Sequence, residues 1–574
     1  MSGRDTGDSE EQTGSGFKKP VHVFWYDNEG KLNENDGEKE ASADSRTGAD
    51  QHEDDSGIQF SEPPFAEEDQ PIISHRKRPQ LKTEKPKVPI PLKMDEFLQQ
   101  LEDEVGFKMS FDIVVREMTF ANKRTAFFFI NGFAKDTVLT EIIKRLTYLE
   151  SEDLSTDVLH DFLDLYVSAV QVAQENDWEL MLNNVLAGGT AMYIEGQSTV
   201  LLIDAKAFPA RNPEEPSLER VVRGARDGFV ETMLVNVTLV RRRLRDKKLR
   251  YEIMRVGERT QTDVCIAYID DIVDKEMLSA IKKKIQQIKL DGLPLADKQL
   301  EEATVKRGWN PFPLVRYSER PDTVAVHLME GHIALFVDTT PSVMILPTTF
   351  FDLTQHAEEN RQTPFIGTYL RWVRFFGIAA SLFLLPLWFL FTLKPELKPP
   401  ALDFIGAQKP GKLPMVAQFL LAEVGVDLMR MASIHTPTPL ATAMSLIAAI
   451  LIGDIAVKTG LFVNEVVLYM AIASIGMFAT PSYELGLANR IIRLLLIVAV
   501  AIFKVPGFMV ATTVTFIMLV LSRSFNRPYM WPLIPFDPKG LLSIIIRVPV
   551  LSNRTRPNLL KPQQRDRMPT DKHR

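Results

Sequence analysis

The apolar stretch between residues 375 and 522 constrains the fold of this chain more than any other feature. Residues 375–393 contain no charged side chain, and residues 440–457 contain one acidic residue, Asp454. Three shorter apolar runs follow at residues 466–479, 494–503 and 508–521. A helix that crosses a bilayer needs about 20 mainly apolar residues, and a soluble core would not absorb five such runs in succession. The sequence therefore predicts a membrane domain over residues 361–548.

The polar parts that flank this domain differ in charge. The net charge of the 574 residues is −7, but the beginning of the chain is acidic and its end is basic. Residues 1–94 have too little apolar area to offset the entropy of ordering, and we expect a disordered acidic tail and linker. Residues 549–574 are expected to form a basic tail. The single cysteine, Cys265, excludes an intrachain disulfide and a multi-cysteine zinc site.

Positive charges predict that both ends of the membrane domain lie in the cytosol. Arginines flank the apolar runs at residues 361, 371, 374, 490, 493, 523 and 527. Two ends on one side require an even number of crossings, whereas five apolar runs make an odd number. We take residues 413–434 as the sixth segment. The result is an all-α polytopic domain of about six segments.

The sixth segment carries a charged stripe. Glu423, Asp427 and Arg430 are spaced at i, i+4 and i+7, which places them on one helical face. An ionisable group at bilayer depth is unfavourable by at least about 2.5 kcal/mol unless it faces water or a partner. One interpretation is a helix that lines an aqueous path, where the two carboxylates favour cations and Asp454 contributes. The other is an amphipathic helix that lies in the membrane interface.

Residues 95–211 and 250–360 show the same predicted order of elements, which indicates two related α/β lobes. The predicted elements are strand 125–130, helix 136–149 and hairpin 190–204 in the first lobe, and strand 262–269, helix 275–288 and hairpin 324–337 in the second. Two dipeptides, Arg-Thr at 124 and 259 and Glu-Gly at 195 and 330, recur at one offset of 135 residues. We interpret this pattern as an internal duplication.

A basic cluster closes the long helix that we predict between the lobes, over residues 212–249. The cluster includes Arg241, Arg242 and Arg243. One interpretation is contact with lipid headgroups, phosphates or a neighbouring subunit. The other is a solvated helix end, where cations interact favourably with the helix dipole.

The sequence contains no motif of a familiar enzyme. A GxxxxGK[ST] phosphate loop, an HExxH zinc motif and a GxSxG nucleophile elbow are all absent. The acidic residues Asp263, Asp270 and Asp271 gather near a predicted strand end, but acidic loops of this kind are common. We therefore expect no catalytic activity, no cofactor, no bound metal and no nucleic-acid partner.

Several motifs resemble those of the spore germination receptor A-subunit family. They are RTQTDV (259–264), NPFP (310–313) and ERPD (319–322) in the lobes, and HTPTPLAT (435–442) and FATPSYEL (478–485) in the membrane domain. The resemblance covers about residues 95–550. It implies an oligomeric complex in the spore inner membrane that moves ions during germination. It also implies membrane lipid, a second membrane subunit and other germination proteins as partners.

Two functions stay open at this point. In the first, the chain forms or gates an ion-conducting path, and Glu423, Asp427, Arg430 and Asp454 belong to that path. In the second, the chain is a non-conducting scaffold or signal relay for germination receptors. Both hypotheses place the lobes and the C-terminal tail in the cytosol.

Overall fold

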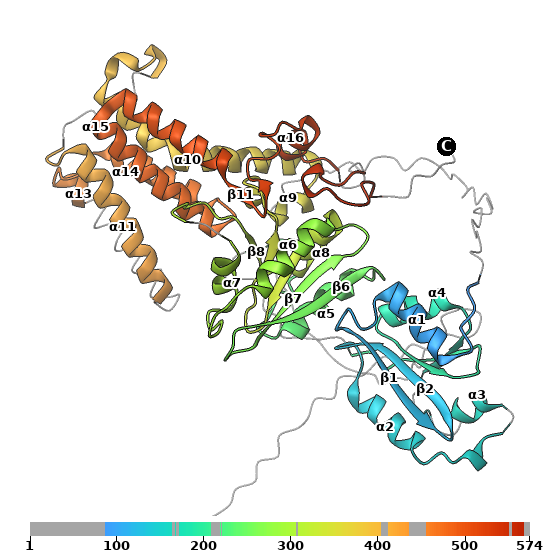
Figure 1. Cartoon of the computed structure of the whole chain (residues 1–574). Helices are drawn as coiled ribbons and strands as arrows, with labels where there is room; N and C mark the ends of the chain where they lie inside the picture. Colours follow the sequence, from blue (N-terminus) through green and yellow to red (C-terminus); the bar gives the residue numbers. More distant parts are fainter. Residues whose placement is uncertain are drawn as a thin grey trace, which may run out of the picture. The chain divides into compact units, whose positions relative to one another are not determined.

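The computed structural model describes most of the chain from residue 87 onward (Figure 1). The described residues are 87–155, 157–163, 167, 171–207, 219, 221–305, 308–402, 411–435, 455–549 and 554–567. All of them belong to one of the two compact units of the chain, residues 83–574. The predicted tail up to residue 86, most of the apolar run 440–457 and Asp454 lie outside the described residues.

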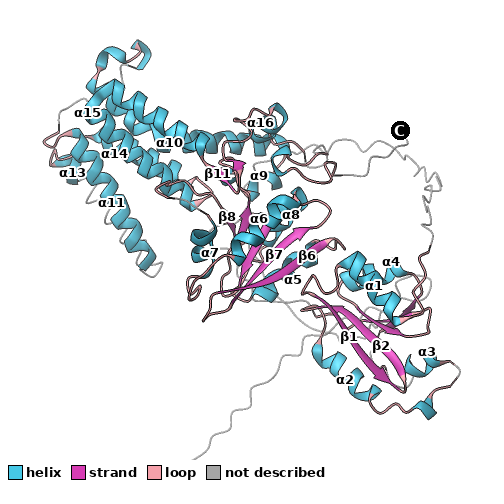
Figure 2. Cartoon of the chain, in the orientation of Figure 1, coloured by secondary structure: helices cyan, strands magenta, loops and turns pink. Residues whose placement is uncertain are grey.

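The first lobe is a five-stranded antiparallel sheet with helices on both faces (Figure 2). Its main elements are α1 (Met94–Val105), β1 (Ile113–Phe120), β2 (Lys123–Ile130), α2 (Asp136–Leu146), α3 (Val158–Asp161), β3 (Val172–Glu175), α4 (Trp178–Leu186), β4 (Thr190–Ile194) and β5 (Val200–Ile203). The strand order is β1-β2-β4-β5-β3. Neighbouring phenylalanines of β2 serve opposite faces, since Phe128 packs with α1 and α4 while Phe127 packs with α2.

The second lobe repeats this topology. Its elements are α5 (Met233–Arg243), β6 (Leu249–Val256), β7 (Thr262–Ile269), α6 (Lys275–Gln286), α7 (Ala296–Thr304), β8 (Arg316–Ser318), α8 (Pro321–Glu330), β9 (Ile333–Val337) and β10 (Val343–Leu346). The strand order β6-β7-β9-β10-β8 matches that of the first lobe position by position. The predicted pair of related lobes therefore has the common topology that a duplication requires.

In the structure, the offset in residue number between equivalent elements of the two lobes differs from the predicted 135. β2 begins at residue 123 and β7 at 262, an offset of 139, whereas β4 begins at 190 and β9 at 333, an offset of 143. The recurring dipeptides at offset 135 are therefore not equivalent. Gly196 lies between β4 and β5, whereas Gly331 ends α8 with a φ of 107° and corresponds to Gly188, which follows α4 with a φ of 104°.

Two predicted elements were wrong. Residues 324–329 form part of helix α8 and not a strand, because Pro321 at the first helical position and Gly331 at the C-cap bound a helix around an apolar run. Of the long helix expected over residues 212–249, the described residues 219 and 221–249 form a helix at Met233–Arg243. Gly224 has a φ of 142°, which a helix does not accommodate. Helix α5 is also the counterpart of α1, so it opens the second lobe and is no separate connector.

A helical region follows the lobes. Its helices are α9 (Ala357–Arg361), α10 (Pro364–Leu393), α11 (Met415–His435), α13 (Ala456–Lys458), α14 (Asn464–Phe478), α15 (Tyr483–Leu521) and α16 (Pro538–Ile545). Among the described residues, α10 and α15 are long and apolar enough to cross a membrane. Lys504 has non-helical dihedrals, φ 54° and ψ −125°, so α15 consists of two helical segments that meet at this residue. The sixth predicted segment, 413–434, is the helix α11.

Helices α10 and α14 approach closely at two glycines. A Cβ placed on Gly476 would lie 2.2 Å from the carbonyl oxygen of Gly377. Beyond this contact, Trp388 and Phe389 of α10 pack with Phe419 of α11 in one apolar core. Small residues at the crossing therefore allow the bulkier side chains of three helices to meet.

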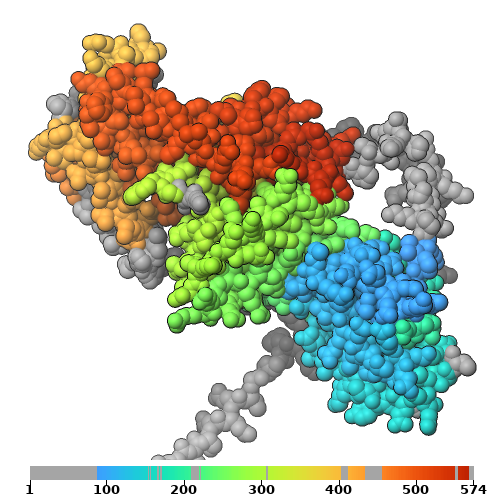
Figure 3. Space-filling view, viewed as in Figure 1, coloured from blue at the N-terminus to red at the C-terminus, as the bar shows by residue number. Residues whose placement is uncertain are grey.

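The second lobe and the helical region also share a core. Leu485, Ala488 and Ile492 of α15 belong to the same buried cluster as Leu335 and Val337 of β9. The space-filling view shows the second lobe, in green, directly against the helical region, in orange (Figure 3). The second lobe and α15 are therefore held together by one hydrophobic core.

Candidate functional site

A buried charge cluster joins α10, α11 and α15. The carboxylate of Glu423 accepts hydrogen bonds from Nε of Arg490 at 2.8 Å and from Nε of Arg493 at 2.7 Å. Arg493 also donates to the carbonyl oxygen of Ser381 in α10 at 2.7 Å. The exposed fractions are 1% for Glu423, 4% for Arg490 and 0% for Arg493. Water is thus excluded from this part of the cluster.

Asp427 and Arg430 extend the cluster toward its edge. Arg430 donates to Asp427 at 2.9 Å, and Arg490 also contacts Asp427. The Asp427 side chain is 39% exposed, against 2% for that of Glu423. The guanidinium of Arg430 lies 5.7 Å from the ring centre of Tyr483, at the start of α15. We call these five residues, Glu423, Asp427, Arg430, Arg490 and Arg493, the charge cluster.

The balance of charge in the charge cluster differs from that of the predicted stripe of Glu423, Asp427 and Arg430. The charge cluster contains two carboxylates and three guanidiniums, so its formal charge is positive. Breaking a buried pair of this kind by removing one partner leaves an uncompensated charge and is strongly unfavourable. The two carboxylates have different environments, since Glu423 is enclosed by arginines and Asp427 keeps access to solvent.

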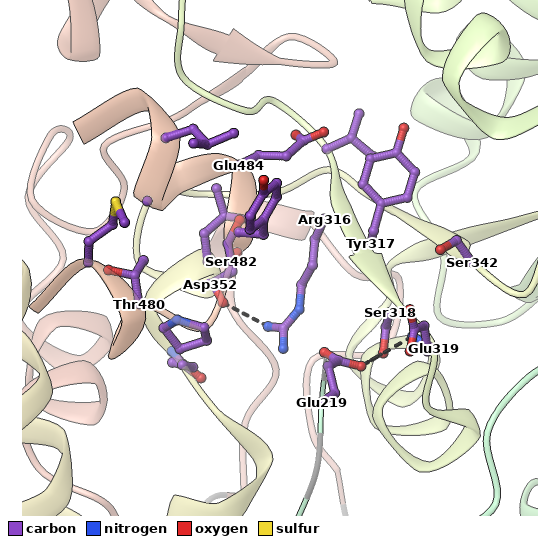
Figure 4. A pocket seen from close by; sticks show the side chains of 18 of the residues that line it. Glu219, Arg316, Tyr317, Ser318, Glu319, Ser342, Asp352, Thr480, Ser482 and Glu484 are labelled. Carbon is purple, nitrogen blue, oxygen red and sulfur yellow. Dashed lines mark hydrogen bonds between the residues drawn. The ribbon is translucent and has the colours of Figure 1, made fainter. Parts of the chain in front are cut away.

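A cavity lies beside the charge cluster, between the second lobe and the helical region (Figure 4). Its volume is about 460 Å³, and Arg430 lines it together with residues of β8 and of the turn between α14 and α15. Across it, Lys298 of α7 lies 3.5 Å from the carboxylate of Glu484 in α15. Five carboxylates and three cationic groups line the cavity: Glu219, Asp297, Glu319, Asp352, Glu484, Lys298, Arg316 and Arg430. The cavity is thus acidic on balance.

Local contacts fix the polar side chains of this cavity. Glu219 accepts a hydrogen bond from the Ser318 hydroxyl at 2.7 Å, and Arg316 donates to the carbonyl oxygen of Asp352 at 2.8 Å (Figure 4). Burial raises the pKa of the Asp297 carboxyl above its ordinary value. Arg430 lines the cavity and donates to Asp427, so it links the cavity to the charge cluster.

The predicted basic cluster has partners within the chain. Arg241 is 1% exposed and donates from Nε to the buried carboxylate of Asp112 at 2.7 Å, which joins the two lobes. Arg243 donates to both oxygens of Asp227 at 2.6 Å. Arg242 is exposed. Contact with a headgroup or another subunit requires an accessible side chain, which Arg241 lacks. The hypothesis stays a prediction for Arg242 and for Arg243, whose side chain is 24% exposed.

The structure brings together three of the four residues predicted for an ion path, Glu423, Asp427 and Arg430, and Asp454 lies outside the described residues. Sequence reasoning missed their partners. Arg490 and Arg493 were interpreted as topology markers before an apolar run, but they lie inside α15 and are buried. Their i, i+3 spacing on one face was the available signal, because carboxylates in an apolar helix require cationic partners.

The chain is a two-lobed α/β protein with an apolar helical region that contains a buried charge cluster. The model of the Bacillus/Clostridium GerA spore germination protein family matches residues 99–559. The chain belongs to this family.

Individual relatives agree with that assignment. The chain is 45% identical over 481 residues to stage V sporulation protein AF of Bacillus subtilis, which covers 84% of this chain and 97% of the relative. It is 30% identical to the uncharacterized membrane protein YfkQ of B. subtilis, over 78% of this chain and 87% of that protein. It is 28% identical to spore germination protein KA of B. subtilis, over 83% of this chain and 88% of that protein.

A solved structure is also similar. The N-terminal domain of the A subunit of the Bacillus megaterium spore germinant receptor GerK3 matches 46% of this chain and 99% of its own length, with 24% identity and a TM-score of 0.36.

Proposed function

We propose that this spore germination protein is an oligomeric, multi-pass protein of the spore inner membrane that forms or gates an ion-conducting path. The observation that carries the proposal is the charge cluster between α11 and α15. Ionisable groups on helices of this apolar character are unfavourable unless they have a role, and they mark ion pathways and proton relays in membrane proteins. The second lobe packs against α15 and lines the acidic cavity together with Arg430 of α11. This position suits a lobe that gates the path.

The two carboxylates have separate roles in this proposal. Glu423 fixes α11 against α15, because both of its oxygens bind arginines that water does not reach. Asp427 faces the path, because 39% of its side chain is exposed at the edge of the cluster. Arg430 balances Asp427 when the path is closed and connects it to the cavity.

The topology follows from the same proposal. The membrane domain has about six segments, with the lobes and the C-terminal tail on the cytosolic side. Lipid, further copies of the chain, a second membrane subunit and other germination proteins are its partners. The chain acts without catalysis, cofactor or metal.

Charge-neutralising substitution of Asp427 tests the proposal. The full chain would be reconstituted in vesicles loaded with potassium chloride, and potassium efflux would be measured with an electrode. We expect Asp427→Asn to change potassium efflux by about tenfold, which corresponds to about 1.4 kcal/mol. Glu396→Gln is the matched control, since Glu396 is an exposed carboxylate in the short turn after α10.

A second function, a non-conducting scaffold or signal relay, predicts a different result. In that case Asp427→Asn leaves efflux at the level of the control while the chain still assembles. Absence of any potassium efflux from vesicles that contain the unsubstituted chain and its membrane partners would also favour the scaffold.

A further inference from the structure

Four aromatic side chains form an exposed stripe at the start of α10. Phe365, Tyr369, Trp372 and Phe376 follow the spacing i, i+4, i+7 and i+11, which places them on one helical face. Their exposed fractions are 85%, 63%, 57% and 75%. A continuous apolar surface of this kind usually marks a contact with a membrane or another protein.

The length of α10 indicates where this stripe lies. The helix has 30 residues, and at about 1.5 Å per residue it extends about 45 Å. The hydrocarbon core of a bilayer is about 30 Å thick. The uncharged part of α10, residues 375–393, is sufficient for that core. The first three turns, with Phe365, Tyr369 and Trp372 of the aromatic stripe, therefore extend beyond it by about 15 Å.

The charges of these turns point inward, away from the stripe. Arg371 donates to Glu359 at 2.7 Å and to the carbonyl oxygens of Ser543 and Ile544 in α16 at 2.7 and 2.8 Å. Arg371 is 5% exposed and Glu359 is 0% exposed. Charged groups inside and aromatic groups outside are the reverse of the surface that a helix presents to water.

Helix α16 extends the same surface. It lies beside the start of α10 (Figure 1), and the hydroxyl of Thr368 accepts a hydrogen bond from the backbone N–H of Arg547 at 3.1 Å. Leu542 of α16 is 55% exposed, and Ile546, which follows the helix, is 44% exposed. The contacts with Arg371 hold α16 against α10, so the two helices present one apolar platform.

We propose that this platform lies in the headgroup layer of the bilayer and that the aromatic stripe sets the depth of α10. Tyrosine and tryptophan favour this layer because their rings are apolar and their N–H and O–H groups reach water. The stripe also leads at Phe376 into the uncharged part of α10, so one surface continues from headgroups to hydrocarbon. The inference rests on the membrane insertion in the proposed function.

Spin labels test the depth of the stripe. The single native cysteine, Cys265, is buried, so an introduced cysteine is labelled selectively. The variants Tyr369→Cys, Trp372→Cys and Phe376→Cys would carry a nitroxide in the full chain, in vesicles of phosphatidylcholine and phosphatidylglycerol. Phe383→Cys in the middle of α10 and Glu396→Cys in the following turn are the deep and aqueous references. The unsubstituted chain, which should take up no label, controls for Cys265.

We expect accessibility to a water-soluble nickel complex to fall, and accessibility to oxygen to rise, from position 369 through 376 to 383. Seven residues of helix correspond to a depth difference of about 10 Å. Nickel accessibility at 369–376 equal to that at 396 would overturn the inference. Shielding of 369–376 from both reagents would also overturn it, because another protein would then cover the stripe. Nickel accessibility at 383 would instead contradict the membrane insertion itself.

Discussion

Neutralising Glu423 is the sharpest test of the charge cluster. Glu423→Gln keeps the shape of the side chain but removes the charge that both Arg490 and Arg493 bind. Asp427 still contacts Arg490, so the charge left without a partner is mainly that of Arg493, which is 0% exposed. Removing one partner of a buried pair is unfavourable by about 3–5 kcal/mol.

That energy should appear in the thermal unfolding of the helical region. For a unit of 150–250 residues, 1 kcal/mol corresponds to about 2–4 °C in Tm, so Glu423→Gln should lower Tm by about 6–20 °C. Unfolding of the full chain in detergent can be followed by tryptophan fluorescence, to which Trp388 in the shared core of α10 and α11 contributes. Glu396→Gln should leave this transition unchanged.

A double substitution separates charge from packing. Glu423→Gln with Arg493→Gln removes both members of the pair, so part of the lost stability should return. The interaction energy of the cycle should exceed about 1 kcal/mol if the two side chains are coupled. A Tm for Glu423→Gln within about 2 °C of the unsubstituted chain, or strict additivity of the two substitutions, would refute the assignment of Glu423 as the residue that fixes α11 to α15.

Two further predictions concern other parts of the chain. Burial lowers the pKa of both His327 and His332 in the second lobe. The unfolded chain therefore binds protons below about pH 6.5 that the folded lobe does not, and stability should fall as the pH decreases from 6.5. The decline in Tm should be smaller for His327→Gln than for the unsubstituted chain. An equal decline in both would contradict the prediction. Gly476→Ala places a methyl group against the backbone of α10 and should destabilise the helical region by about 1–3 kcal/mol. Gly486→Ala is its control, because a Cβ there meets no atom closer than 3.4 Å; equal Tm values for both variants would argue against the close contact.

The lobes illustrate how far local patterns predict a fold. The strand at 262–269 and the helix starting at residue 275 were found with accurate bounds, since apolar periodicity and flanking polar residues agree there. Helix α8 was missed because its run Val324–Ala325–Val326 is β-branched on alternate residues, while the decisive signals, Pro321 and Gly331, lie at its ends. The two related lobes were predicted from the matching order of elements, whereas the dipeptides that supported this prediction are not structurally equivalent.

The charge cluster shows what sequence spacing does not contain. The pattern placed Glu423, Asp427 and Arg430 on one face of α11, and in the structure all three belong to the charge cluster. Arg490 is 63 residues from Asp427 in the chain, so their pairing depends on how α15 packs against α11. Tertiary packing also decides burial, which separates enclosed Glu423 from accessible Asp427.

The contact between Arg241 and Asp112 has a consequence for mechanics. Both groups are enclosed, and the strand end beside them adds a hydrogen bond of 3.0 Å from the N–H of Phe111 to the carbonyl oxygen of Tyr251. Separating the lobes would leave the charges of Arg241 and Asp112 without their partners. The two lobes should therefore move as one rigid body. A force applied to the first lobe would then be transmitted through the second lobe to α15.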